Sequence, residues 1–288
     1  MKLHLDCIPC FLKQSIEASR MATDNEEVHD KVMKEVLKLL QNINYEKSPP
    51  ELSREVHRII RSITKIEDPY KKVKDESNEM IKKIYNQLKE KIKKSADPLL
   101  TSIKLAIVGN VIDFGTMNRF NIDDMIKHAL KREFDDKDYI LFKKVLEKSK
   151  NILYLADNSG EIFFDKLLIE ELKKNSKNIT YVVKQNPIIN DVLKIDAEYA
   201  EINNLAKIIS YDKDQDISSP GIVMDFASKE FKEYFEKSDM IISKGQGNYE
   251  GLSSIEKRVF FLLVAKCPLV AKDIRSEVGK LILKVNKW

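Results

Sequence analysis

The feature that most constrains the fold is a change of hydrophobic period near residue 151 of this 288-residue chain. Beyond that point, short apolar runs rich in β-branched residues alternate with segments of helical spacing. Such alternation predicts βαβ units and a mostly parallel sheet, and therefore an α/β protein. The predicted strands are 152–156, 179–183, 208–210, 240–243 and 281–285, the predicted helices are 161–174, 188–201, 226–237 and 253–264, and segment 268–272 fits a further short strand.

The half of the chain before this change has helical spacing throughout. Asp68-Pro69 and Asp97-Pro98 each pair an N-cap residue with proline at the first helical position, which predicts a long charged helix to about residue 94 and a buried helix over 99–108. We expect residues 1–149 to form a helical N-terminal subdomain packed on an α/β core of residues 150–288. The other predicted helices are 8–22, 26–41, 50–63, 121–132 and 136–149.

Charge and cysteine content exclude several classes of protein. Lys and Arg number 50 against 46 Asp and Glu, and the two signs are interleaved, so we expect no nucleic-acid partner. No apolar stretch reaches 18 residues and the start is not a signal peptide, so we expect no membrane partner and a cytoplasmic location. Three cysteines argue against a disulfide framework. Nothing in the sequence indicates the oligomeric state.

Four polar clusters stand at the ends of predicted strands or helices. Three of them follow separate strands, and parallel strands place their carboxyl ends on one edge of a sheet, where ligands bind. We therefore expect these three clusters to converge. Each also has a plain interpretation as a turn or a helix cap, so the argument depends on their occurring together. The clusters are Gly109–Asp113, Asp157–Glu161, Asn186–Asp191 and Lys244–Glu250.

The residue types in these clusters suit phosphate chemistry. Oxygen ligands from Asp157, Asn158 and Asp191 suit a hard divalent cation, which typically takes one or two carboxylates plus substrate phosphate. Lys244 would neutralise a phosphate oxygen, and the turns at Ser159-Gly160 and Gly245–Gly247 would offer backbone N–H groups. The set predicts metal-assisted phosphoryl transfer to water.

The cysteines form a separate candidate site. Cys7 and Cys10 make a CxxC at a helix start, where a thiolate pKa can be lowered. With His4 and Cys267 they could supply four soft ligands for zinc or take part in redox chemistry. Structural or inert thiols, and a catalytic thiol, remain alternatives.

Taken in order, the motifs resemble the metal-dependent damage-control phosphatases, once catalogued as a domain of unknown function. The resemblance runs over essentially the whole chain, includes the segment Lys266–Pro268, and is closest to the subfamily common in archaea, which carries the N-terminal CxxC. It is carried by Cys7-x-x-Cys10, Gly109-Asn110-x-x-Asp113, Asp157-Asn158-x-Gly160-Glu161, Pro187-x-x-Asn190-Asp191 and Lys244-Gly245-Gln246-Gly247-Asn248-Tyr249-Glu250.

This resemblance implies a Rossmann-like three-layer α/β/α core, with mostly parallel sheet, and an N-terminal helical part packed on it. It implies hydrolysis of phosphate esters of small metabolites, such as sugar phosphates, nucleotides or phosphopantetheine derivatives. It also implies a divalent metal cofactor (Mg²⁺, Mn²⁺, Co²⁺ or Ni²⁺) held by Asp157, Asn158 and Asp191. The candidate phosphate- and substrate-binding residues are Asn110, Ser159, Gly160, Glu161, Lys244, Gly245 and Asn248.

Three questions stay open at this point. Asp157 or Asp113 could act as nucleophile or base, through an aspartyl-phosphate or through attack by water, and the absence of an Asp-x-Asp nucleophile pattern favours water. An S-adenosylmethionine-dependent carboxyl methyltransferase is a rival, although no glycine-rich first βα turn is present. A non-catalytic metal- or redox-responsive binding protein that uses Cys7 and Cys10 is the second rival.

Overall fold

The computed structural model describes residues 1–109, 126, 131, 136–174, 176–213 and 216–286. Asn110 and Asp113, two of the residues singled out in the sequence, lie outside the described residues. Among the helices of these ranges, none is both long enough and apolar enough to cross a membrane.

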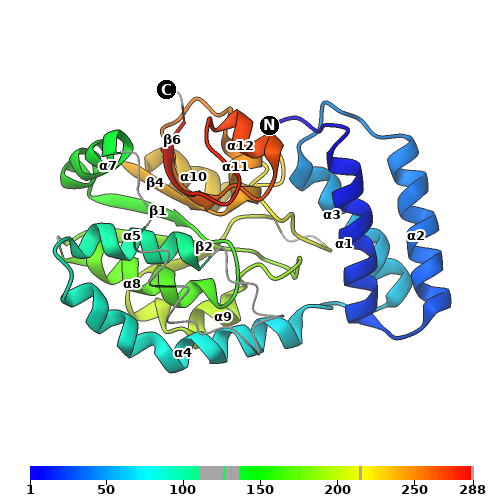
Figure 1. Ribbon diagram of the computed structural model, residues 1–288, viewed down its shortest axis with the longest axis horizontal. Coiled ribbons are helices and arrows are strands. Elements are labelled where there is room, and N and C mark those ends of the chain that lie inside the picture. The colour runs from blue at the N-terminus through cyan, green and yellow to red at the C-terminus, as the bar shows by residue number, and fades with distance from the viewer. Residues whose placement is uncertain (110–125, 127–130, 132–135, 175, 214–215, 287–288) are drawn as a thin grey trace.

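A six-stranded sheet forms the centre of the described part of the molecule (Figure 1). Its order is β3-β2-β1-β4-β5-β6, and all neighbours pair in parallel except β5 and β6. This confirms the predicted α/β class with a mostly parallel sheet, and the order is that of a Rossmann fold. The strands are β1 (Asn151–Leu155), β2 (Asn178–Val183), β3 (Lys207–Ser210), β4 (Met240–Lys244), β5 (Phe260–Val264) and β6 (Leu281–Val285).

Both faces of the sheet are buried because helices cover each of them. Successive side chains of a strand point to opposite faces, so Tyr154 and Ile242 belong to one apolar core and Leu155 and Ile241 to the other. The first face carries α5 (Pro98–Val108), α7 (Asp136–Lys148), α8 (Glu161–Lys173) and α9 (Lys194–Tyr199), with α4 (Lys71–Lys93) outside α8, and the second carries α10 (Lys229–Lys237), α11 (Gln246–Leu252) and α12 (Pro268–Asp273).

The first three helices form a bundle with its own small core (Figure 1). They are α1 (Cys7–Ala22), α2 (Glu26–Gln41) and α3 (Pro49–Thr64), and α3 packs against α11 of the α/β part. A capping box between Ser48 and Glu51 opens α3, and proline stands at its first turn. The helices α4, α5 and α7, although they precede residue 150, share the core of the sheet rather than that of the bundle.

Two predictions for the C-terminal part are wrong. Segment 260–264, expected within a helix, is the internal strand β5, and segment 268–272, expected as a strand, lies in α12. The five residues of β5 are all buried, so their apolar run lacks the alternation that marks a half-buried strand. Pro268 at the first turn of α12 is a helix-start signal. In addition, the helix expected over 188–201 is limited to Lys194–Tyr199 and the following short 3₁₀ turn.

Candidate active site

The candidate site lies where the strand order reverses. The adjacent strands β1 and β4 lead into α8 and α11, which cover opposite faces, and such a switch point opens a crevice at the carboxyl ends. Asp157 follows β1 and Gly245 follows β4. A Cβ atom built on Gly245 would come within 1.9 Å of Asp157 Oδ2, so the carboxylate lies directly over this glycine. The positive φ of 79° at Gly245 is a second reason for glycine here.

The loop after β2 brings Asp191 to the same place. Asn158 and Asp191 face each other in an isolated bridge, Ser159 N donates to Asn190 O at 2.9 Å, and Val192 N donates to Asp157 O at 2.9 Å. The three residues predicted to hold a metal are therefore brought together by backbone pairing between two loops.

Burial disfavours the ionised forms of the Asp157 and Asp191 carboxyl groups. Burial raises the pKa of Asp191 to about 8, and the negative charge of Asp157 adds to this shift while Lys184 opposes it. Burial also raises the pKa of Asp157 to about 6, with a further contribution from Glu161. Asp191 Oδ2 is buried and accepts no hydrogen bond from any described residue, and it forms an ion pair with the ammonium of Lys184 at 3.6 Å. A cation between the carboxylates would relieve the repulsion between them and offset the cost of burying their charges.

Asn158 completes an oxygen donor set. Its Nδ2 donates to Asp157 Oδ2 at 2.8 Å and to Glu161 Oε2 at 3.2 Å, which leaves Oδ1 as the atom for a cation. Two carboxylates and an amide oxygen are the ligand types that Mg²⁺ and related ions take. The residues present therefore fit the divalent ion that the motifs imply. Within the described ranges no group of three or more His, Cys, Asp and Glu side chains is arranged to hold a metal, so Asn158 would be the third protein ligand.

Lys244 does not reach the cleft. Its side chain is fully buried, and its ammonium donates to Glu161 and, at 2.6 Å, to Asp165 Oδ1. Tyr154 and Tyr181 hydroxyls donate to the two oxygens of Asp165 at 2.8 and 2.9 Å. Lys244 and Glu161, both assigned to phosphate from the sequence, thus belong to a buried network beneath the candidate metal-binding residues.

Most of the other expected phosphate contacts are also occupied. Gly160 N donates to Asn78 Oδ1 at 2.6 Å, and Gly245 N donates to Leu262 O at 3.1 Å. Asn248 uses its whole amide on backbone groups, donating to Ala156 O and Lys244 O and accepting from Ile222 N. Ser159 is different because its buried Oγ has no partner among the described residues. In the first turn of α8, which follows directly, Phe163 N already donates to Gly160 O at 3.2 Å.

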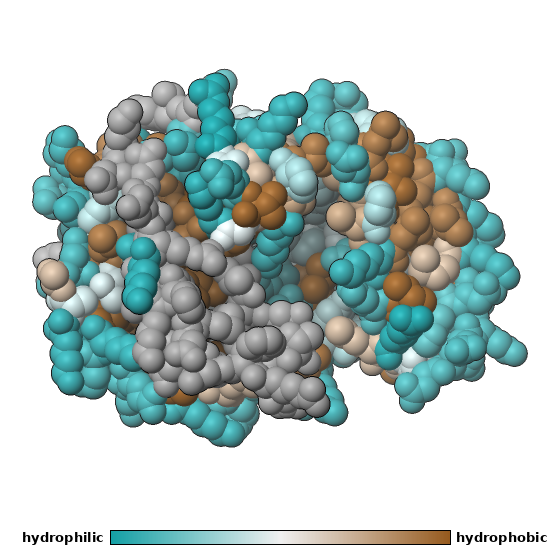
Figure 2. Space-filling view, viewed as in Figure 1, coloured by the Kyte–Doolittle hydropathy of each residue, from teal (hydrophilic) through white to brown (hydrophobic). Residues whose placement is uncertain are grey.

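A cleft of about 460 Å³ lies between the candidate metal-binding residues and the N-terminal bundle. In Figure 2 the surface is hollowed between the bundle on the right and the α/β part. Asp157, Asn158 and Asp191 line the cleft on one side, and α1, α3 and α12 line it on the other. The residues contributed from those helices and their flanks include Cys7, Cys10, Phe11, Gln14, Pro50, Ser53, Lys266, Cys267, Pro268 and Leu269.

All three cysteines lie at this cleft, although they are far apart in the sequence. They are free thiols, and burial raises the pKa of Cys7 and Cys10. The approach of Cys267 to the N-terminus could not be anticipated from the sequence. The places of Asn78 and Lys184 in the site could not be anticipated either. Asn78 comes from α4, and the ammonium of Lys184 lies over the ring of Tyr211, 4.7 Å from its centroid.

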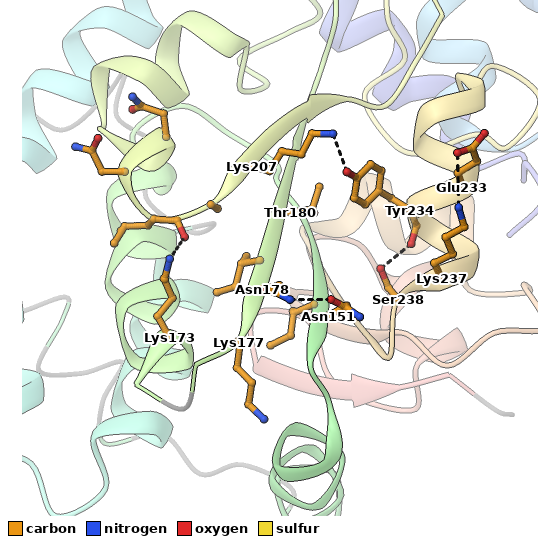
Figure 3. A pocket seen from close by; sticks show the side chains of 16 residues that line it. Asn151, Lys173, Lys177, Asn178, Thr180, Lys207, Glu233, Tyr234, Lys237 and Ser238 are labelled. Carbon is orange, nitrogen blue, oxygen red and sulfur yellow. Dashed lines mark hydrogen bonds and ion pairs between the residues drawn. The ribbon is translucent and has the colours of Figure 1, made fainter.

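A larger cavity of about 770 Å³ lies at the opposite edge of the sheet (Figure 3). Its lysines have structural partners. Lys177 donates to Ser149 O at 2.5 Å, Lys173 donates to Leu205 O at 2.6 Å, and Lys207 donates to Glu230 Oε1 at 2.8 Å. These contacts hold helix and strand ends, so we place the chemistry at the switch point instead.

Known proteins are similar to this chain over nearly its whole length. A family model described as the damage-control phosphatase ARMT1-like domain matches residues 3–282. The chain belongs to the damage-control phosphatase ARMT1-like family. The family identified from the ordered motifs is thereby confirmed, and its model covers the bundle, the sheet and the cleft between them.

Relatives within the ARMT1-like family are similar over their full lengths. The chain is 36% identical to the damage-control phosphatase PH1575 of Pyrococcus horikoshii, covering 100% of this chain and 99% of the relative. It is 34% identical to a damage-control phosphatase of Archaeoglobus fulgidus, covering 99% of each. The crystal structure of a DUF89 family protein, PH1575 of Pyrococcus horikoshii, superposes with a TM-score of 0.90 at 33% identity and covers 100% of both chains.

Proposed function

We propose that this protein is a divalent-metal-dependent phosphatase that hydrolyses phosphate monoesters of small metabolites, such as sugar phosphates or nucleotides. The observation that carries the proposal is the pair of buried carboxylates, Asp157 and Asp191, held together with Asn158 at the switch point. The names of two full-length relatives, both damage-control phosphatases, support the same activity.

In this proposal Asp157, Asn158 and Asp191 hold the metal, which can be Mg²⁺, Mn²⁺, Co²⁺ or Ni²⁺. When bound, such an ion supplies positive charge that polarises a phosphoryl oxygen. The carboxylates fix its position because their loops are paired and the carboxylate of Asp157 lies against Gly245. The Oγ of Ser159, which has no partner among the described residues, is the candidate donor to a phosphoryl oxygen.

The organic part of the substrate lies toward the bundle. Phe11, Pro50 and Leu269 offer apolar surface there, while Gln14 and Ser53 offer neutral polar groups. Water, rather than a side chain, attacks phosphorus, because the carboxylate of Asp157 is already engaged. Its Oδ2 accepts from Asn158 Nδ2 and lies directly over Gly245. The role of Asp113 remains a prediction.

The cysteines favour a second function of the same cleft. Since Cys7, Cys10 and Cys267 line it together, oxidation of these thiols would alter access to it. Unchanged phosphatase activity after Cys7→Ser and Cys10→Ser would make these thiols structural or regulatory rather than catalytic.

The test is phosphate release by chelator-treated protein from p-nitrophenyl phosphate and from a sugar phosphate, with and without added Mn²⁺ or Co²⁺. We expect release with metal and none without it. Asp157→Ala should abolish release while circular dichroism shows an intact fold, and Asp225→Ala, at an exposed position, is the matched control. Full activity of Asp157→Ala would contradict the proposed site.

A further inference from the structure

Glu250 is a carboxyl group of the cleft to which the proposed reaction has so far given no task. It lies on α11, the helix that follows β4 and Gly245, and it lines the cleft together with Asp157 and Asp191. It belongs to neither the buried Lys244 network nor the proposed metal ligands.

Gln246 holds Glu250 in place. Gln246 Nε2 donates to Glu250 Oε1 at 2.8 Å across one helical turn. The other end of the same amide, Gln246 Oε1, accepts from Lys266 N at 2.8 Å, and Nε2 also lies 3.7 Å from Cys267 Sγ. Because Gln246 is fixed at both ends, the carboxyl group of Glu250 has a defined position at the cleft wall.

The surroundings favour the protonated form of Glu250 near neutral pH. Burial raises its pKa to about 7, and the charge of Asp157 adds to this, while the Gln246 donor and the N-terminal ammonium act in the opposite direction. That ammonium, on Met1, donates to Glu250 O at 2.5 Å. The other titratable groups that interact with Glu250 are the thiols of Cys7 and Cys10 on α1, and the cleft is also lined by Asp6, Lys266 and Cys267.

We propose that Glu250 is the general acid that protonates the leaving oxygen of the substrate. This inference rests on the proposed phosphatase function. As water forms its bond to phosphorus, the ester P–O bond breaks and its electron pair passes to the ester oxygen, which takes the proton from Glu250. The proton lost by the attacking water goes to solvent or phosphate, and solvent reprotonates the Glu250 carboxylate.

Other cleft groups suit this task less well. Asp157 and Asp191 must be ionised to hold a cation, and Lys244 is sequestered from the cleft. Burial makes the thiols of Cys7 and Cys10 weaker acids than usual. A carboxyl group with a pKa near the working pH is the most effective proton donor.

The test uses two esters that differ in their need for an acid. An alkoxide leaves poorly without a proton, whereas p-nitrophenolate is stable enough to leave without one. With Mn²⁺ present, Glu250→Gln should lower kcat for a sugar phosphate about 10²- to 10⁴-fold and change kcat for p-nitrophenyl phosphate about threefold at most. Glu256→Gln, at an exposed position just beyond α11, is the matched control and should match the wild type on both.

The pH profile separates a proton donor from a merely structural residue. For the sugar phosphate, wild-type kcat should fall on the alkaline side as Glu250 loses its proton, and Glu250→Gln should lack this limb. Equal losses on both esters, or no loss on either, would overturn the role of Glu250. A wild-type protein that hydrolyses neither ester would instead refute the proposed phosphatase function.

Discussion

At the scale of single residues, Gly245 must be glycine for two reasons, its positive φ and its contact with Asp157. Gly279 has a similar φ, 82° against 79°, but a Cβ built on it meets nothing within 4 Å. We expect Gly279→Ala to cost about 1–2 kcal/mol of unfolding free energy, the penalty of the backbone conformation alone. Gly245→Ala should cost more and should also lower metal affinity at least tenfold, because the new methyl group displaces the Asp157 carboxylate. Equal effects of the two changes, measured by urea unfolding and by calorimetric metal titration, would refute this account.

Lys244 is expected to matter first for stability. Lys244→Met leaves Glu161 and Asp165 without their buried partner, so we expect unfolding free energy to fall by about 3–5 kcal/mol. Lys237→Met, at an exposed position, should change it by less than about 0.5 kcal/mol. Urea unfolding of the metal-free proteins measures both. A fully stable Lys244→Met protein that fails to bind phosphate would instead restore the role expected from the sequence.

The raised carboxyl pKa values give the metal-free protein a distinctive pH dependence. Asp157 and Asp191 bind protons more tightly in the folded state than in the unfolded chain, with folded pKa values of about 6 and 8. The folded state is therefore favoured at low pH, and its stability falls as pH rises from the unfolded pKa through these values. We expect melting temperatures to fall between pH 5 and 8 without metal, less steeply in Asp191→Asn, and to recover with Mn²⁺. A flat profile that Asp191→Asn does not alter would contradict this.

At the scale of elements, the sequence predicted best where caps and periodicity agree. The helices α1, α2 and α3 lie within one residue of their predicted bounds, and Asp97 caps α5 by accepting from Leu100 N. The strand β5 was missed because its five apolar residues continued a helical pattern that begins at residue 253, with no glycine or proline between. Burial on both faces does not by itself hide a strand, since β4 is buried throughout and was predicted.

The helix α4 has a role in the site that no local signal could reveal. Its Asn78 accepts from Gly160 N at 2.6 Å and donates to Asp196 Oδ1 at 2.8 Å, which ties α4 to the turn after β1 and to α9. Asn78→Ala should cost about 1–3 kcal/mol of unfolding free energy, because it leaves the buried Gly160 N–H unpaired. Asn86→Ala, exposed on the same helix, should cost less than about 0.5 kcal/mol. Equal urea midpoints for the two variants would refute the role of Asn78.

At the scale of the whole molecule, the sheet explains why the site could be predicted in part. The order of parallel strands brings Asp157, Asn158 and Asp191 to one edge, and that convergence follows from topology alone. Side-chain direction does not follow from it, so Lys244, the last residue of β4, was expected in the cleft but lies beneath it. The approach of Cys267 to α1 depends on packing between the bundle and the α/β part, which leaves no mark on local sequence.

The metal site is the central claim, and anomalous diffraction from a crystal soaked in Mn²⁺ tests it most directly. The account predicts a peak about 2.0–2.3 Å from oxygens of Asp157, Asn158 and Asp191, lost in a crystal of Asp191→Asn. An ordered crystal with no peak there at saturating Mn²⁺, or with its strongest peak among Cys7, Cys10 and Cys267, would contradict it.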